Sequence, residues 1–176
     1  MKGREKRRLP SPARRAYLPP MIDELYSARI LSLAANLPHA GRLPAPEGTG
    51  ERVAKLCGSR AIVDVVLDDQ GRIAAFAQDV KACALGQAAA GVLGQDVIGA
   101  TAQEVRDARD AMSAMLKSGG AGPEGRFEGL RALRQVADYP ARHASTLVAV
   151  EATLDAVEQA LLKHQSDTRT RLAGAA

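Results

Sequence analysis

Cys57 and Cys83 are the only cysteines of the chain, and both stand where a thiol can be reactive. Cys57 lies in Lys-Leu-Cys-Gly-Ser-Arg before a predicted strand, and Cys83 lies in Val-Lys-Ala-Cys-Ala-Leu-Gly-Gln at a predicted helix start. Backbone N–H groups at a helix start and the neighbouring cations Lys55, Arg60 and Lys81 favour the thiolate, which is a nucleophile and a metal ligand. The pattern predicts a site for metal or sulfur. The alternative is that both are small buried hydrophobic residues, as free cysteines often are.

The residues between the two cysteines predict a β-hairpin that returns Cys83 toward Cys57. Residues 61–67 are rich in β-branched side chains, residues 68–71 (Asp-Asp-Gln-Gly) are a turn signal, and residues 72–80 alternate as a return strand. We therefore expect the two thiols to approach each other despite the 26 positions that separate them.

Helical patterns flank this hairpin. Before it, apolar residues recur at helical spacing over residues 22–35, followed by a loop rich in Pro and Gly over residues 36–50 and a short strand over residues 51–56. After it, helices are expected at residues 82–93, 101–116, 127–136 and 140–165. A Thr-x-x-Glu capping box opens the second of these helices. The last carries an apolar stripe of Leu147, Val150, Leu154, Val157 and Leu161. Strands grouped early and helices grouped late predict the α+β class, with a small antiparallel sheet of about three strands and helices packed on one face.

The composition limits the compartment and the class of protein. A chain of 176 residues suits one domain, and with no Trp and five other aromatic residues its core must be mainly aliphatic. Two cysteines cannot build a disulfide framework, which indicates a reducing compartment. No apolar run approaches the ~18 residues of a membrane helix, and the basic start lacks the apolar stretch of a secretory signal. We expect a cytoplasmic protein with no membrane partner.

The first 20 residues differ from the rest in charge. They hold seven Lys or Arg and one acid, a charge of +6, whereas the whole chain carries +4 and residues 21–176 carry −2. With four prolines, this tail is expected to be disordered. Because no basic patch with interleaved aromatics recurs in the body, nucleic acid is not an expected partner. The predicted organisation is a basic tail at residues 1–20, one domain at residues 21–165 and a frayed C-terminus at residues 166–176.

An ordered series of motifs over about residues 24–155 resembles the IscU/NifU family of iron–sulfur cluster assembly scaffolds. In chain order, the motifs are Glu24-Leu25-Tyr26-Ser27, Cys57-Gly58, Gly71-Arg72-Ile73, Cys83-Ala84-Leu85, Phe127-Glu128-Gly129-Leu130 and Tyr139-Pro140-Ala141-Arg142-His143-Ala144-Ser145. The long stretch between Cys83 and Ser145 resembles the branch of the family that carries an insertion there, the SufU-like branch.

The chain departs from the family pattern at two positions. The family usually has Asp two positions after its first cysteine, where this chain has Ser59. It usually has a third cysteine near the start of the last helix, where the candidates here are Ala144 and Ser145, and His143 matches a histidine that many members place beside that cysteine. The resemblance implies three metal ligands, Cys57, Cys83 and His143, with Ser59 and Ser145 as weaker secondary candidates.

The resemblance implies a non-enzymatic scaffold that receives sulfur from a cysteine desulfurase, assembles a transient iron–sulfur cluster and passes it to apo-protein acceptors. Iron–sulfur clusters are usually held by four ligands, mostly thiolates, so a fourth ligand would come from water, a small thiol or a second subunit of a homo-oligomer. The missing third cysteine keeps two alternatives open. One is a zinc-binding interaction or regulatory module, and the other is a thiol sulfur carrier that needs one cysteine and no metal.

Overall fold

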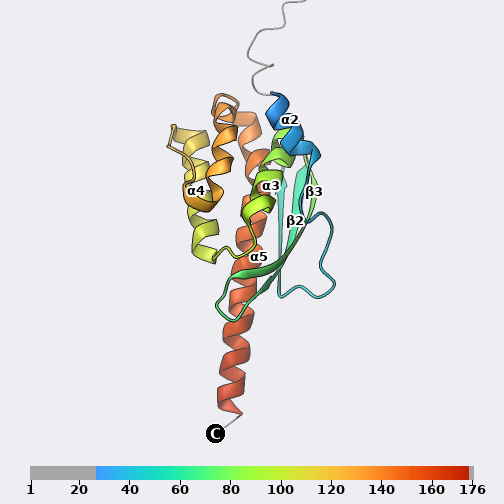
Figure 1. Ribbon diagram of the computed structural model, residues 1–176, viewed down its shortest axis with the longest axis vertical. Coiled ribbons are helices and arrows are strands. Elements are labelled where there is room, and N and C mark those ends of the chain that lie inside the picture. The colour runs from blue at the N-terminus through green and yellow to red at the C-terminus, as the bar shows by residue number, and fades with distance from the viewer. Residues whose placement is uncertain (1–26, 175–176) are drawn as a thin grey trace, which may run out of the picture.

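The computed structural model describes residues 27–174. The elements, in chain order, are α2 (Ala28–Ala35), β1 (Gly48–Ala54), β2 (Ser59–Leu67), β3 (Ile73–Lys81), α3 (Ala84–Asp96), α4 (Ala102–Ser118), the 3₁₀ helix η1 (Gly125–Asp138) and α5 (Pro140–Ala173). The strands form one antiparallel sheet in the order β1-β2-β3. The long helix α5 lies between this sheet and the pair formed by α4 and η1 (Figure 1). The predicted α+β class, with helices packed against a small antiparallel sheet, is confirmed.

The first half of α5 is buried on nearly all sides. The predicted apolar stripe is buried as far as Val157, and Leu161 packs against it partly exposed. Residues between the members of that stripe are buried as well, including Val148, Ala149, Ala152, Thr153 and Ala156. The prediction of one core face was therefore incomplete, because the sheet packs on one side of α5 while α3, α4 and η1 pack on others.

Strand β1 crosses α5 at close range. Gly48 and Gly50 lie at the point of contact, where a Cβ at Gly48 would overlap the carbonyl oxygen of Ala156 and a Cβ at Gly50 would overlap that of Ala152. Glycine in a strand often marks such a close approach of two backbones. The absence of side chains at these two positions thus sets the distance between the sheet and its central helix.

Polar contacts fix the same crossing at its edges. The N–H of Thr49 donates to Oε1 of Gln159 at 2.7 Å, so this edge-strand donor is satisfied by the helix. The guanidinium of Arg52 forms two bonds with the carboxylate of Asp155, at 2.5 and 2.7 Å. Because both ends of these bonds are on β1 and α5, they fix the register of the strand along the helix.

The segment before β1 is anchored to the sheet through a buried carboxylate. Asp64 accepts two bonds from Arg42, at 2.6 and 3.0 Å, one from the Thr49 hydroxyl at 2.7 Å and one from the N–H of Leu43 at 3.1 Å. Burial alone would raise the pKa of Asp64, but these bonds outweigh it and hold the pKa below its ordinary value. The predicted loop over residues 36–50 is shorter than expected, since β1 begins at Gly48.

The helices after the sheet follow the predicted order with different details. The capping box is confirmed, because Thr101 Oγ1 accepts from the N–H of Glu104 and the Glu104 carboxylate accepts from the N–H of Thr101. The segment around Phe127 was predicted as a short helix and forms the 3₁₀ helix η1, with Phe127 outside helical φ/ψ.

The two ends of the described chain differ from the predicted bounds. Helix α2 begins at Ala28 with Ser27 as its N-cap; residues 22–26 of the predicted first helix, like the basic tail, lie outside the described residues. Helix α5 continues to Ala173, past its predicted end near Gln165, and the hydroxyls of Thr168 and Thr170 donate to carbonyls one turn earlier. Within residues 27–174, no helix is both long enough and apolar enough to span a membrane.

Candidate functional site

Cys57 sits on the tight turn between β1 and β2. The N–H groups of Cys57 and Gly58 both donate to the carbonyl of Ala54, at 3.3 and 2.8 Å. Gly58 has φ of +71°, a backbone conformation that residues with a Cβ rarely adopt. The turn leaves the thiol of Cys57 exposed at the end of the sheet.

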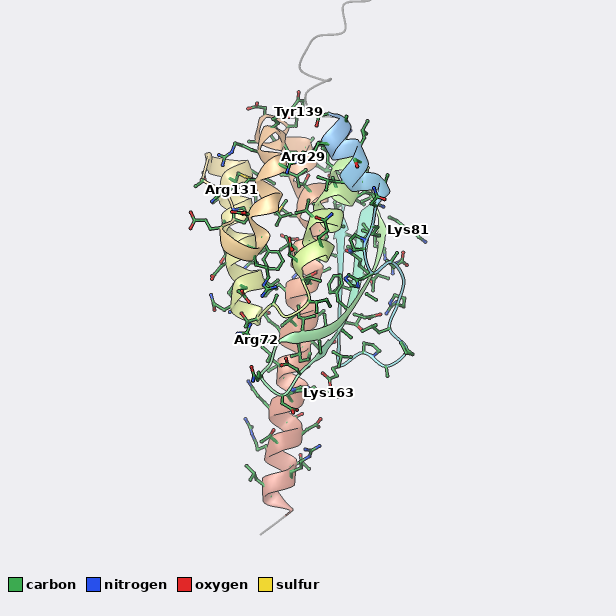
Figure 2. All side chains as sticks on the ribbon, viewed as in Figure 1. Arg29, Arg72, Lys81, Arg131, Tyr139 and Lys163 are labelled. Carbon is green, nitrogen blue, oxygen red and sulfur yellow. The ribbon has the colours of Figure 1, made fainter. Side chains whose placement is uncertain are left out.

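Cys83 reaches the same end of the sheet from the following element. It is the N-cap residue of α3, two residues after the end of β3, and its carbonyl accepts the N–H of Gln87 at 2.9 Å. Strand β3 pairs with β2 so that Arg60 lies opposite Lys81, which returns the chain to the turn that carries Cys57. Lys81, at the end of β3, and Tyr139, just before α5, both lie in the half of the molecule opposite the projecting end of α5 (Figure 2).

Two serine hydroxyls connect the cysteines. Oγ of Ser59 lies 3.1 Å from Sγ of Cys57 and accepts the N–H of Cys83 at 3.4 Å, so one hydroxyl contacts both cysteine residues. Oγ of Ser145 lies 3.5 Å from Sγ of Cys83 and donates to the carbonyl of Arg142 at 2.9 Å. Both serines are buried, and Ala144 is exposed. Of the two candidates for the position of the absent third cysteine, Ser145 is the one beside the thiols.

The surroundings of Cys57 favour its ionised form. Hydrogen bonds from the hydroxyl and the N–H of Ser59 lower the pKa of the Cys57 thiol, and a smaller effect of burial opposes them. The hydroxyl of Ser145 and the positive charge of Arg142 act in the same direction as Ser59. The thiol is exposed, so electrophiles and metals can reach it, and the lowered pKa increases the fraction present as thiolate at a given pH.

We expect replacement of Ser59 by alanine to raise the pKa of Cys57, because the thiolate loses its strongest hydrogen bond. The alkylation rate of Cys57 by iodoacetamide, followed against pH by mass spectrometry, should then rise at a higher pH than in the unmodified protein. Ser145→Ala, which removes a weaker contribution, should shift the profile less. Superimposable profiles for the Ser59→Ala and unmodified proteins would contradict this assignment.

An open pocket of about 610 Å³ gives access to both thiols. Its lining combines the two cysteines, Ser59, backbone and apolar atoms of the adjoining strand and helix, Gln87 and two cations, Lys81 and Arg142. Arg142 was not among the residues singled out from the sequence. Its signal was its position three residues before Ser145, since residues three apart on a helix share a face.

His143 is not brought to the thiols. Its Nε2 lies 3.1 Å from the carbonyl oxygens of both Val136 and Ala137, at the end of η1. His143 precedes Ser145 by two positions, and on an α-helix two positions correspond to a rotation of about 200°. With Ser145 facing the thiols, the imidazole faces away from them. Its role as a ligand remains an untested prediction.

The protein groups at the site supply two strong metal ligands. Within residues 27–174, no three side chains of Cys, His, Asp or Glu are grouped so that they could hold a metal ion. Ser59 and Ser145 add neutral oxygens, which bind iron or zinc weakly unless they lose a proton. The arrangement therefore fits a metal or a cluster only when further ligands come from outside these residues.

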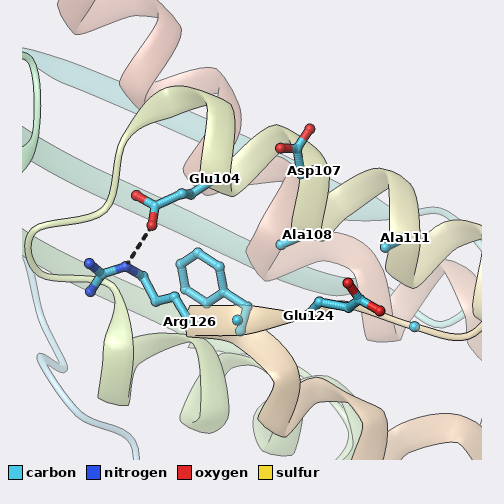
Figure 3. A pocket seen from close by; sticks show the side chains of 9 residues that line it. Glu104, Asp107, Ala108, Ala111, Glu124 and Arg126 are labelled. Carbon is cyan, nitrogen blue, oxygen red and sulfur yellow. Dashed lines mark hydrogen bonds and ion pairs between the residues drawn. The ribbon is translucent and has the colours of Figure 1, made fainter.

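A second pocket, of about 410 Å³, lies between α4 and the start of η1 and is lined by Glu104, Asp107, Glu124 and Arg126 (Figure 3). Its acidic groups have partners within the fold. Glu104 closes the capping box and accepts from Arg126 at 3.3 Å, and Glu124 pairs with Arg131 at 3.4 Å. The Glu104–Arg126 contact joins α4 to η1, and we assign this pocket a structural role.

Solved structures of other proteins resemble the chain over most of its length. The N-terminal part of a nitrogen-fixing NifU-like protein from Brucella abortus is 48% identical, with a TM-score of 0.78 over 81% of this chain and 99% of that one. A proposed iron–sulfur cluster assembly scaffold protein for the SUF system, from the thermophile Fervidobacterium islandicum AW-1, is 21% identical, with a TM-score of 0.69 over 77% of this chain and 98% of that one. A hypothetical protein is 22% identical, with a TM-score of 0.65 and the same coverage as the second. No family model and no curated protein matches the chain.

Proposed function

The chain belongs to the family of NifU-like N-terminal domains, and from this premise we propose that it is a scaffold for iron–sulfur cluster assembly. The cargo would be iron and sulfide, held transiently by Cys57 and Cys83 and then passed to an apo-protein. The Fervidobacterium protein of the same fold bears the name of such a scaffold. In this role the protein holds iron and sulfide while they form a cluster and then gives the cluster up, and we propose that it is not an enzyme.

The observation that carries the proposal is the convergence of the two cysteines. They come from different elements, the β1–β2 turn and the N-terminus of α3, yet Ser59 contacts both and one open pocket is lined by both. Two packing cysteines would have no need of an open pocket, and Cys57 is exposed rather than buried. A pair of accessible thiols in one pocket is what an exchangeable metal or sulfur cargo requires.

The small number of protein ligands fits a cargo that must leave. Two thiolates hold a tetrahedral ion less firmly than the three or four protein ligands of a structural site. We propose that Ser59 and Ser145 support the thiolates through hydrogen bonds instead of binding the metal. His143 would then serve to join α5 to the end of η1 through the carbonyls of Val136 and Ala137.

The same shortage of ligands favours one alternative, a thiol sulfur carrier. Such a carrier needs an exposed thiol that ionises readily, and Cys57 is exposed with a pKa lowered mainly by Ser59. It would carry sulfur on Cys57 without metal. A zinc-binding interaction module is a further alternative, which differs from the scaffold in the metal that it retains.

We expect either Cys57→Ala or Cys83→Ala to abolish tight metal binding, because one remaining thiolate cannot replace the pair. The measurement is anaerobic reconstitution with iron and sulfide, followed by desalting, absorbance spectroscopy and determination of iron, sulfide and zinc. His143→Ala is the matched variant, and its iron content should equal that of the unmodified protein if the imidazole is structural.

The outcomes separate the candidates. Iron and sulfide retained by the unmodified protein and lost from both cysteine variants support the scaffold. Zinc retained in the same pattern supports the interaction module. A separate incubation with a persulfidated cysteine desulfurase tests the sulfur carrier. The Cys57 thiolate attacks the outer sulfur of the donor persulfide, and the donor cysteine leaves as a thiolate. A Cys57 persulfide that also forms in Cys83→Ala, with no metal retained, supports this function. Equal metal content in all four proteins would rule out the thiol pair as the site.

The partners follow from the proposed role. A scaffold must receive sulfur, so we propose a cysteine desulfurase as the donor, an electron donor that reduces its persulfide sulfur to sulfide, and apo-proteins as acceptors. Thiols that must remain reduced require a reducing compartment, and we retain the cytoplasm as the proposed location. A homo-oligomer would be relevant if a second copy supplied the missing ligands.

A further inference from the structure

The pocket that holds the two thiols is positively charged. Lys81 and Arg142 line it, and no carboxylate side chain does. Among residues 27–174, neither cation forms an ion pair with an Asp or Glu side chain, whereas Arg42, Arg52, Arg60, Arg106, Arg109, Arg126 and Arg131 do. Both charges are therefore available to an anion that enters the pocket.

The two thiols of the pocket are fewer than the ligands that the proposed cargo needs. The described residues provide two strong ligands, and an iron–sulfur cluster usually takes four. About 610 Å³ of open space adjoins the cysteines, which is enough for a small molecule and falls in the usual range for ligand pockets. A ligand that carries its own thiol would complete the set.

From these two features we infer that the pocket binds a small thiol that carries carboxylates. The thiol would lie beside Cys57 and Cys83, and the carboxylates would pair with Arg142 and Lys81. Arginine holds a carboxylate through two parallel N–H bonds, which gives direction as well as charge to such a contact. The binding of an anionic thiol by the pocket does not depend on the proposed function. Only the role of that thiol as an additional metal ligand rests on it.

The charge preference can be measured without metal by thiol–disulfide exchange. The Cys57 thiolate attacks one sulfur of a small symmetric disulfide, a new S–S bond forms, the S–S bond of the reagent breaks, and its other half leaves as a thiolate. Three reagents of similar size differ in charge: the dianionic 3,3′-dithiodipropionate, the neutral 2-hydroxyethyl disulfide and the dicationic cystamine. Rates on the whole chain are read by mass spectrometry at each cysteine, and the same chain unfolded in urea gives the intrinsic reactivity of each reagent.

We expect the folded protein to prefer the dianionic over the dicationic reagent by about tenfold more than the unfolded chain does, as charge steering produces. The double variant Lys81→Gln/Arg142→Gln should lose this preference, and added salt should weaken it. Arg169→Gln is the matched control: it removes one exposed cation about 40 Å along α5 from Arg142, well beyond the range of unscreened charge. Equal preferences in folded and unfolded protein, or an equal loss in Arg169→Gln, would overturn the inference.

A second measurement separates this inference from the proposed function. The protein is reconstituted with iron and sulfide in glutathione or in the cationic thiol cysteamine, desalted, denatured in acid and analysed for iron and for thiol. Glutathione that remains with the iron, and is lost from the double variant, supports both proposals. Charge-selective exchange with no iron retained supports the binding of an anionic thiol in the pocket and rejects the scaffold function. Iron retained equally in both thiols, with no thiol bound, rejects the external ligand and leaves the scaffold intact.

Discussion

Replacement of Gly50 by alanine is expected to destabilise the protein by more than about 3 kcal/mol, the upper range for overpacking in a core. The new Cβ would overlap the carbonyl oxygen of Ala152. A flexible side chain could move aside, but a backbone carbonyl within a buried helix cannot move without shifting the helix. The loss is a large part of the ~5–15 kcal/mol that stabilises a typical domain.

Urea unfolding followed by circular dichroism gives the free energy of unfolding for this comparison. Gly58→Ala is the matched control, because a Cβ there meets open space and the cost comes from the φ of +71°, about 1–2 kcal/mol. A loss for Gly50→Ala no larger than that for Gly58→Ala would mean that β1 and α5 separate easily. Iron retention by the surviving folded fraction then tests whether the site tolerates that separation.

Replacement of Ser145 by cysteine is expected to increase iron retention about tenfold or more, since it adds a third thiolate to a site that has two. The hydroxyl of Ser145 already lies 3.5 Å from Sγ of Cys83, so a thiol at this position needs no movement of α5 to join the pair. The measurement is the iron and sulfide that remain on the protein after reconstitution and repeated desalting, together with the half-life of the visible absorbance.

Ala144→Cys provides the control for the added thiol itself. It changes the adjacent, exposed residue of the same helix. Consecutive residues of an α-helix are rotated by about 100° around its axis, so Ala144 and Ser145 point in different directions. It should leave iron retention unchanged. If both cysteine variants bind iron equally, the added thiol binds iron without having to face Cys57 and Cys83. If neither exceeds the unmodified protein, the thiols of Cys57 and Cys83 do not form the site that we propose.

The sheet and the order of the helices could be predicted from the sequence because their signals are local. The Asp-Asp-Gln-Gly turn between a β-branched run and an alternating run predicted both strands of the hairpin to within two residues at each end. The burial of the first half of α5 on nearly all sides could not be predicted in this way. It results from contacts with elements far along the chain, and a helix rich in alanine shows little periodicity when every face is covered.

The thiol pair could be predicted from residue type and motif. Sequence matching alone could not show which residue near the start of α5 faces the thiols at the position of the family's third cysteine. Among the four residues of Arg142-His143-Ala144-Ser145, helical rotation decides which side chains face Cys83. Arg142 and Ser145 share one face, and His143 lies on another. Applying that rotation to the sequence would have selected Arg142 as a residue of the pocket.

The buried state of α5 has a consequence for how a cargo would leave. On the α5 side the pocket is lined by Arg142, three residues before Ser145, where the buried stretch of that helix begins. The opposite wall is the turn of residues 55–57, whose side chains are exposed. Local opening has a low free-energy cost in such a turn and a high one in a packed helix. For the scaffold that we propose, we therefore expect release by separation of Cys57 from Cys83 while the buried part of α5 stays packed.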